Sequence, residues 1–205
     1  MGWRMAKKPS LARANAQLRV AIRQLHETID AHQASDHDFG RISCRKGCTG
    51  CCRQLVLAEL SEAEYILARN PEVVERVLPK LVEHAQFAAQ LPDTLASEEA
   101  EHAATEAYWQ RNLPCAFLED GLCSVYEDRP LPCRTHFVLS DPALCATDEI
   151  SPTVIADFGT RTQAPQRLMQ LVSKAKGQLA AAALPILMVE AVRLQRTRKQ
   201  ESVHG

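Results

Sequence analysis

Cys44-Arg45-Lys46-Gly47-Cys48-Thr49-Gly50-Cys51-Cys52 places four thiols within nine positions, and we expect the fold to form around this stretch. The short spacing lets several thiolates converge on one centre, and Gly47 and Gly50 permit the tight turns that this requires. Scattered buried cysteines would not cluster in this way. Tight clusters of thiols in a reducing compartment are metal sites, so the stretch predicts a metal-binding core.

A second group of thiols follows later in the chain with the spacing Cys115-x7-Cys123-x9-Cys133. Neither group alone has the two-knuckle spacing of a zinc ribbon. We therefore predict that both groups build one site, although about sixty residues separate Cys52 from Cys115. The predicted metal ligands are Cys44, Cys48, Cys51, Cys52, Cys115, Cys123 and Cys133.

The number of thiols and their chemistry limit the cofactor. All-sulfur ligation suits zinc or an iron–sulfur cluster, whereas magnesium, calcium and manganese prefer oxygen. Side chains of adjacent residues such as Cys51 and Cys52 diverge in most backbone conformations, so both serve one tetrahedral ion only in a distorted turn. Seven or eight thiols exceed the four of one tetrahedral ion. Either two zinc sites, or one iron–sulfur cluster with additional thiols nearby, would account for seven or eight thiols.

Positively charged residues accompany the cysteines and predict charge compensation. Zinc with four thiolates carries a formal charge of −2, which nearby cations can balance. We expect Arg129 and Arg134, which flank Cys133, to contact the cofactor, although solvated loop positions are the alternative for either one. His136 is a candidate nitrogen ligand, but a surface or hydrogen-bonding histidine is the more frequent role.

Three stretches together resemble the CxxCxxCC cysteine-cluster family, whose members are described as zinc- or iron-chelating or as iron–sulfur-cluster containing. They are CRKGCTGCC, the helix start at Ser61 and Glu64, and PCAFLEDGLCSVYEDRPLPCR, and the resemblance covers about residues 42–140. The family's cysteine quartet matches Cys44, Cys48, Cys51 and Cys52. Its C-x-F-L, C-x-x-Y and R-P-x-x-C-R elements match Cys115, Phe117, Leu118, Cys123, Tyr126, Arg129, Pro130, Cys133 and Arg134.

This resemblance implies metal binding and says little about activity, because function depends on the site and not on the fold. A similar domain occurs in flagellin lysine methylases. The family inclines the choice of cofactor towards an iron–sulfur cluster. The first spacing here is x3 where the family name has x2, and Cys145 lies beyond the matched motifs.

Composition and charge describe one ordinary domain spanning residues 1–205. Of the 205 residues, 46% are hydrophobic and 24% charged, the proportions of a soluble protein with a buried core. The net charge is −1, with basic ends around an acidic body, which argues against a broad nucleic-acid surface and leaves a protein partner unidentified. The start lacks a secretory h-region, and the longest apolar run, residues 177–189, is too short to span a membrane. We expect a cytoplasmic protein.

Helical periodicity predicts a mainly α fold, with helices flanking a small, irregular, cysteine-rich metal core that contains a short β-hairpin. We expect an N-terminal helix within 1–34, a metal core with inserted helices over 40–146, and a helical segment over 160–200 that Gly177 and Pro185 bend or split. Ser61 with Glu64 indicates a capping box, and Pro71 begins the next helix. A further helix is expected over residues 93–112.

Two structural predictions concern pairing. The apolar stripe of residues 11–29 needs a partner, and we predict an antiparallel pair with the helix around residues 168–189; a dimer is the competing arrangement. For the hairpin around Asp120-Gly121, we predict a three-residue loop with positive φ at Gly121, which puts Cys115 and Cys123 on one face.

The sequence carries no recognisable catalytic motif: HExxH, GxSxG, a phosphate loop and a dinucleotide fingerprint are all absent. The first hypothesis is therefore a redox or metal-handling protein. A component of a cluster-dependent group-transfer or modifying enzyme is the second, and a structural zinc module that docks a protein partner is the third. An enzymatic activity is not assigned.

Overall fold

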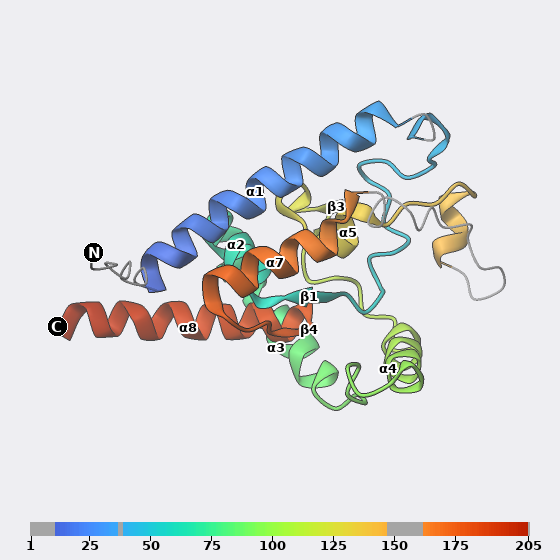
Figure 1. Ribbon diagram of the computed structural model, residues 1–205. Coiled ribbons are helices and arrows are strands. Elements are labelled where there is room, and N and C mark those ends of the chain that lie inside the picture. Colours follow the sequence, from blue (N-terminus) through green and yellow to red (C-terminus); the bar gives the residue numbers. More distant parts are fainter. Residues whose placement is uncertain (1–10, 37–38, 147–161, 205) are drawn as a thin grey trace.

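The computed structural model describes residues 11–36, 39–146 and 162–204, and the fold is mainly α, as predicted. Long helices flank an irregular region that contains the cysteines (Figure 1). The helices are α1 (Leu11–Ser35), α2 (Leu60–Arg69), α3 (Pro71–Ala88), α4 (Glu98–Gln110), α5 (Leu131–Thr135), α7 (Ala164–Lys176) and α8 (Leu184–His204). The short strands β1 (Leu57–Glu59) and β4 (Ala181–Ala183) form one pair, and β2 (Leu118–Glu119) and β3 (Leu122–Cys123) form another.

The largest part of the hydrophobic core lies between α2, α3 and α8. Ile66, Val74 and Met188 are fully buried there, one from each helix. Phe117, from the segment that carries the second group of cysteines, packs in the same cluster. This shared packing fixes that segment against the helices.

A second cluster joins α1 to α7, which lie side by side and run in opposite directions (Figure 1). The predicted stripe of α1 is buried through Ile22 and Ile29, which pack in this cluster with Leu168 and Val172 of α7. The antiparallel pair is therefore formed within one chain. Residues 1–10 lie outside the described residues.

The C-terminal helical segment is split at Gly177, as expected from its sequence. Gly177 has φ of +81°, in the left-handed region that glycine adopts without strain, and its N–H donates to the carbonyl of Ser173 at the end of α7. The chain then forms β4, which pairs antiparallel with β1. This sheet was not predicted, because three consecutive alanines carry no strand signal.

Two predicted helix starts are displaced. The capping residue of α2 is Glu59, whose side chain accepts from the N–H of Ser61, and Glu62 completes the capping box instead of Glu64. Glu59, Ser61, Glu62 and Glu64 lie within six positions, so the motif fits the sequence in more than one register. Helix α4 begins only at Glu98, where Ser97 accepts from the N–H of Ala100.

The predicted three-residue hairpin loop is wrong. Leu118 pairs with Cys123 and Glu119 with Leu122, so the loop is the two residues Asp120 and Gly121. Both have positive φ, +50° and +75°, as a type I′ turn requires. The expectation of positive φ at Gly121 is confirmed. Asp120 accepts the left-handed region as well, which is why the shorter loop forms.

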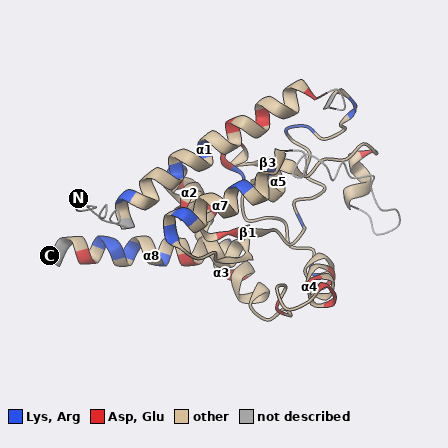
Figure 2. Cartoon of the chain, viewed as in Figure 1, with Lys and Arg blue, Asp and Glu red and all other residues tan. Residues whose placement is uncertain are grey.

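Charged residues are unevenly distributed: basic residues gather on α7 and α8, and acidic residues on α4 (Figure 2). On α8, Arg193, Arg196 and Arg198 form ion pairs with Glu190, Glu75 and Glu64 respectively. Among the described residues, we find no helix with the length and apolar character that a membrane span needs.

Candidate metal centre

All seven cysteines that were predicted as metal ligands line one cavity of about 110 Å³. The structure thus brings together two groups that are far apart in sequence, as predicted. Apolar side chains including Val56, Phe117, Val125 and Leu184 complete much of the wall. No Asp or Glu is among the described residues that line it. The donor set is therefore sulfur-rich and poor in hard oxygen ligands.

Tight turns hold the first group of cysteines. The N–H of Cys48 donates to the carbonyl of Arg45, and the N–H of Cys52 donates to that of Thr49. Gly47 has φ of +91°, which a residue with a side chain rarely adopts, so this glycine is required by the turn.

One backbone hydrogen bond joins the two groups directly: the N–H of Cys115 donates to the carbonyl of Cys52 over 2.6 Å. Cys115 precedes strand β2 and lies in a turn, closed by the N–H of Leu118 donating to its carbonyl. The alternation of side chains along a strand therefore does not apply to it. The two-residue hairpin loop leaves Cys115 and Cys123 on the same cavity.

Cys133 is placed by the short helix α5, and a buried carboxylate holds the start of that helix. Glu62 accepts from the N–H of Leu131 through Oε1 at 2.7 Å and from the N–H of Glu59 through Oε2 at 3.1 Å. The first bond joins α2 to the start of α5, and the second belongs to the capping box of α2. Burial raises the pKa of Glu62 to about 7.

The environment of the thiols disfavours free thiolates. Burial raises the pKa of Cys115 to about 11 and raises that of Cys133 well above its ordinary value. The pKa of Cys51 is raised first by its hydrogen bond with Cys52 and then by burial. Since a metal needs the thiolate form, a bound cation would supply the charge that stabilises it here.

The two arginines that were expected at the cofactor occupy different places. Arg129 lines the cavity, stacks on the ring of Tyr126 at 4.0 Å, and donates through Nε to the carbonyl of Cys133. Arg134 does not line the cavity: its Nη1 binds both oxygens of Asp30 at 2.6 Å, and its Nη2 donates to the carbonyl of Glu127. Contact of Arg129 with a cofactor stays a prediction, whereas Arg134 is placed to hold α1 against α5.

Sequence reasoning left Cys145 unassigned, and the structure places it beside the first group. Its side chain is buried, and its pKa is raised by burial and then by Cys51, Cys44 and Cys48. A Cβ added to Gly50 would lie 2.7 Å from the Cβ of Cys145, so the two segments are in close contact. The signal in the sequence was the even total of eight cysteines.

His136 also lines the cavity. Its Nε2 is buried and has no hydrogen-bond partner among the described residues. Burial lowers the pKa of its imidazole, which favours the neutral form. The cavity therefore combines seven sulfurs with one unpaired imidazole nitrogen.

These donors fit zinc or an iron–sulfur cluster by their chemistry. Within the part of the chain that the structure describes, no three Cys, His, Asp or Glu side chains are already arranged around a single metal position. The seven thiols surround the cavity without closing on one point. The fit rests on the identity of the donors and on the cavity that they share.

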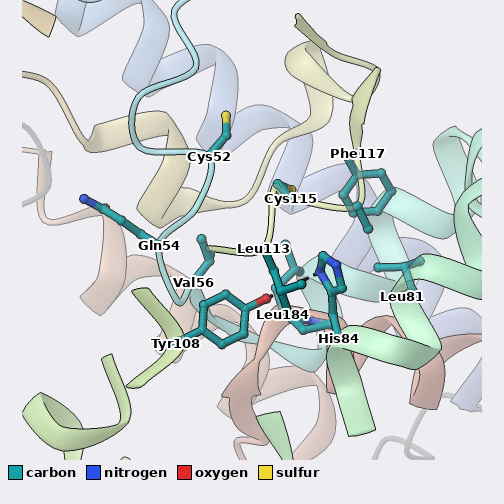
Figure 3. A pocket seen from close by; sticks show the side chains of 12 residues that line it. Cys52, Gln54, Val56, Leu81, His84, Tyr108, Leu113, Cys115, Phe117 and Leu184 are labelled. Carbon is teal, nitrogen blue, oxygen red and sulfur yellow. Dashed lines mark hydrogen bonds between the residues drawn. The ribbon is translucent and has the colours of Figure 1, made fainter. Parts of the chain in front are cut away.

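A second, smaller cavity of about 30 Å³ shares Cys52 and Cys115 with the first (Figure 3). Tyr108 of α4 points towards His84 of α3, with 3.5 Å between the phenolic oxygen and Nδ1. Burial, followed by the proximity of Cys115, raises the pKa of Tyr108 to about 12. This contact joins α4 to α3 at the smaller cavity.

Comparison with known proteins agrees with this donor set. A family model matches residues 43–152, more than half of the chain, and covers both groups of cysteines together with Cys145. No curated protein and no solved structure matches the chain. The cysteine-lined cavity and this match lead to one conclusion: the chain belongs to the CxxCxxCC family, described as "Putative zinc- or iron-chelating domain".

Proposed function

We propose that this protein holds an iron–sulfur cluster in the cysteine cavity and serves in electron transfer or metal handling. The family supports chelation of zinc or iron. The observation that carries the choice of a cluster is the gathering of seven thiols around one cavity of about 110 Å³. One tetrahedral zinc ion uses only four thiolates. A cavity of about 10–15 Å³ already holds a water molecule, so the cysteine cavity has room for a larger group than one ion.

The cysteines and Arg129 around the cavity have different expected roles in binding the cluster. Cys115, Cys51 and Cys123 each contribute to the raised pKa of Cys133, so these four thiols lie close together and are the first candidates for ligands. Cys44, Cys48 and Cys145 lie near one another and near Cys51. Arg129 supplies positive charge at the wall of the cavity. An iron–sulfur cluster, when bound, supplies reversible one-electron chemistry.

Purification without oxygen tests this proposal. We expect a brown protein that contains iron and acid-labile sulfide in similar amounts, with a visible absorption that reductant bleaches. A colourless protein that contains zinc and no sulfide would overturn the cluster and favour the structural zinc module. Cys51→Ser should lower the bound iron, whereas Ser43→Ala, next to Cys44 but outside the wall of the cavity, should leave it unchanged.

A further inference from the structure

We infer that His136 is a nitrogen ligand, through Nε2, of the group held in the cysteine cavity, which makes the centre mixed in nitrogen and sulfur. This inference rests on the proposed function and adds a ligand to that same site. Three observations carry it: the position of His136 in the wall, the state of Nε2, and the spacing from Cys133.

The first observation is that Nε2 is buried and unpartnered at this cavity. Among the described side chains, three nitrogens are buried without a hydrogen-bond partner, and they belong to His26, Arg134 and His136. Only His136 lines the cavity with the thiols. Buried polar groups are normally satisfied, so an unsatisfied nitrogen at a sulfur-rich cavity indicates a missing partner there.

The second observation is the geometry of the chain between Cys133 and His136. Cys133 lies in α5, and the N–H of His136 donates to the carbonyl of Pro132 at 3.1 Å, which continues the helical turn to His136. Residues three apart on such a turn face the same side. Cys133-Arg134-Thr135-His136 therefore presents a thiol and an imidazole as a chelating pair.

The chemistry of imidazole fits both metals that the description of the family names. Neutral imidazole is a good ligand for zinc and for iron. In an iron–sulfur cluster, replacing a thiolate by an imidazole removes negative charge and raises the reduction potential. Arg129, in the wall of the same cavity, donates to the carbonyl of Cys133 and so stabilises this turn.

X-ray absorption at the edge of the bound metal, on full-length protein purified without oxygen, tests the assignment for either metal. The wild type should show nitrogen as well as sulfur in its coordination shell. His136→Phe keeps an aromatic ring in the wall and should lose the nitrogen contribution. His136→Cys should bind the metal with sulfur alone, and for an iron–sulfur cluster its reduction potential should fall below that of the wild type.

His26→Phe is the matched control, because His26 is also buried with an unpartnered ring nitrogen but lies outside the cavity. Its metal spectrum should equal that of the wild type. A wild type with only sulfur around the metal, or a nitrogen contribution that persists in His136→Phe, overturns the role of His136 and leaves the proposed function intact. A wild type that holds no metal overturns both. If His136→Phe fails to fold, the wild type and His136→Cys still decide whether His136 is a ligand.

Discussion

Arg134 places Nη1 2.6 Å from both carboxylate oxygens of Asp30, and this pair joins α1 to the residue that follows Cys133. The guanidinium is almost fully buried, with 2% of the side chain exposed, whereas Asp30 is half exposed. The carbonyl of Arg134 accepts a further hydrogen bond from Nε2 of Gln33 on the same helix. Helix α1 is thus attached to the metal core by polar contacts at its C-terminal end.

Asp30→Asn should therefore destabilise the protein more than the loss of an exposed ion pair does. The substitution leaves a buried positive charge without its counter-charge, and we expect the free energy of unfolding to fall by about 1–3 kcal/mol. Urea unfolding measures this change. Glu190→Gln, which removes the exposed pair with Arg193 on α8, is the control and should cost no more than about 0.5 kcal/mol. Equal effects of the two substitutions would contradict the role of Arg134.

Removal of the metal should lower the melting temperature and open the loops that carry the cysteines. The regular elements in these loops are at most five residues long, and ligation supplies part of the free energy that orders them. We expect limited proteolysis to cut within residues 40–54 and 113–146 after chelation. Cys48→Ser or Cys133→Ser should lower the metal content and give the same cleavage. A melting temperature that is unchanged after complete removal of the metal would refute this prediction.

Glu62 should make the protein less stable as the pH rises from about 4.5 to about 7. Burial raises its pKa from the ordinary value of 4.5 to about 7, so in this interval the folded chain keeps a proton that the unfolded chain releases. The stabilisation is complete below the unfolded pKa and is lost as the pH passes the folded pKa, at about 1.4 kcal/mol for each unit of the difference.

Glu62→Gln measures this effect because it removes the titration and keeps one acceptor oxygen for the N–H of Leu131. The free energy of unfolding of the wild type, relative to the variant, should be larger at pH 5 than at pH 8. A difference that stays constant between these two pH values would show that Glu62 does not titrate in this interval.

Gly50→Ala should displace the segment that carries Cys145. The added methyl group would lie 2.7 Å from the Cβ of Cys145 and 2.9 Å from the carbonyl oxygen of Pro142, closer than real contacts allow. We expect a loss of about 1–3 kcal/mol in stability and a lower metal content. Gly40→Ala is the control, since nothing lies within 4 Å of a Cβ at that position. If both variants bind metal like the wild type, the close contact of Gly50 with Cys145 is unimportant for the site.

The sequence predicted the features that depend on local spacing. The stripe through Ile22 and Ile29 is a periodic pattern along one helix, and Gly177 supplies the left-handed residue that ends α7. The two groups of cysteines predicted a shared site through the chemistry of their thiols. The first two features are encoded by residues that are neighbours in the chain, and the third by one residue type that recurs in two distant groups.

The features that were missed depend on contacts between distant segments or on small differences in local energy. The pairing of Ala182 with Ala58 joins segments more than a hundred residues apart, and neither segment has the β-branched residues of a strand. The hairpin register depended on whether Asp120, besides Gly121, takes a positive φ, which costs little for Asp. The position of Cys145 became visible only once the chain had folded back onto Gly50.

The bond from Cys115 to the carbonyl of Cys52 joins two groups of cysteines that a ribosome makes at different times. About 80 residues lie between Cys52 and Cys133, so at about 5–20 residues per second a ribosome needs about 4–16 s to add the last of the seven thiols after the first four. During that time the nascent chain carries a quartet of closely spaced cysteines without the rest of the cavity. Metal delivered after synthesis meets all seven thiols, whereas metal captured earlier meets only the first four.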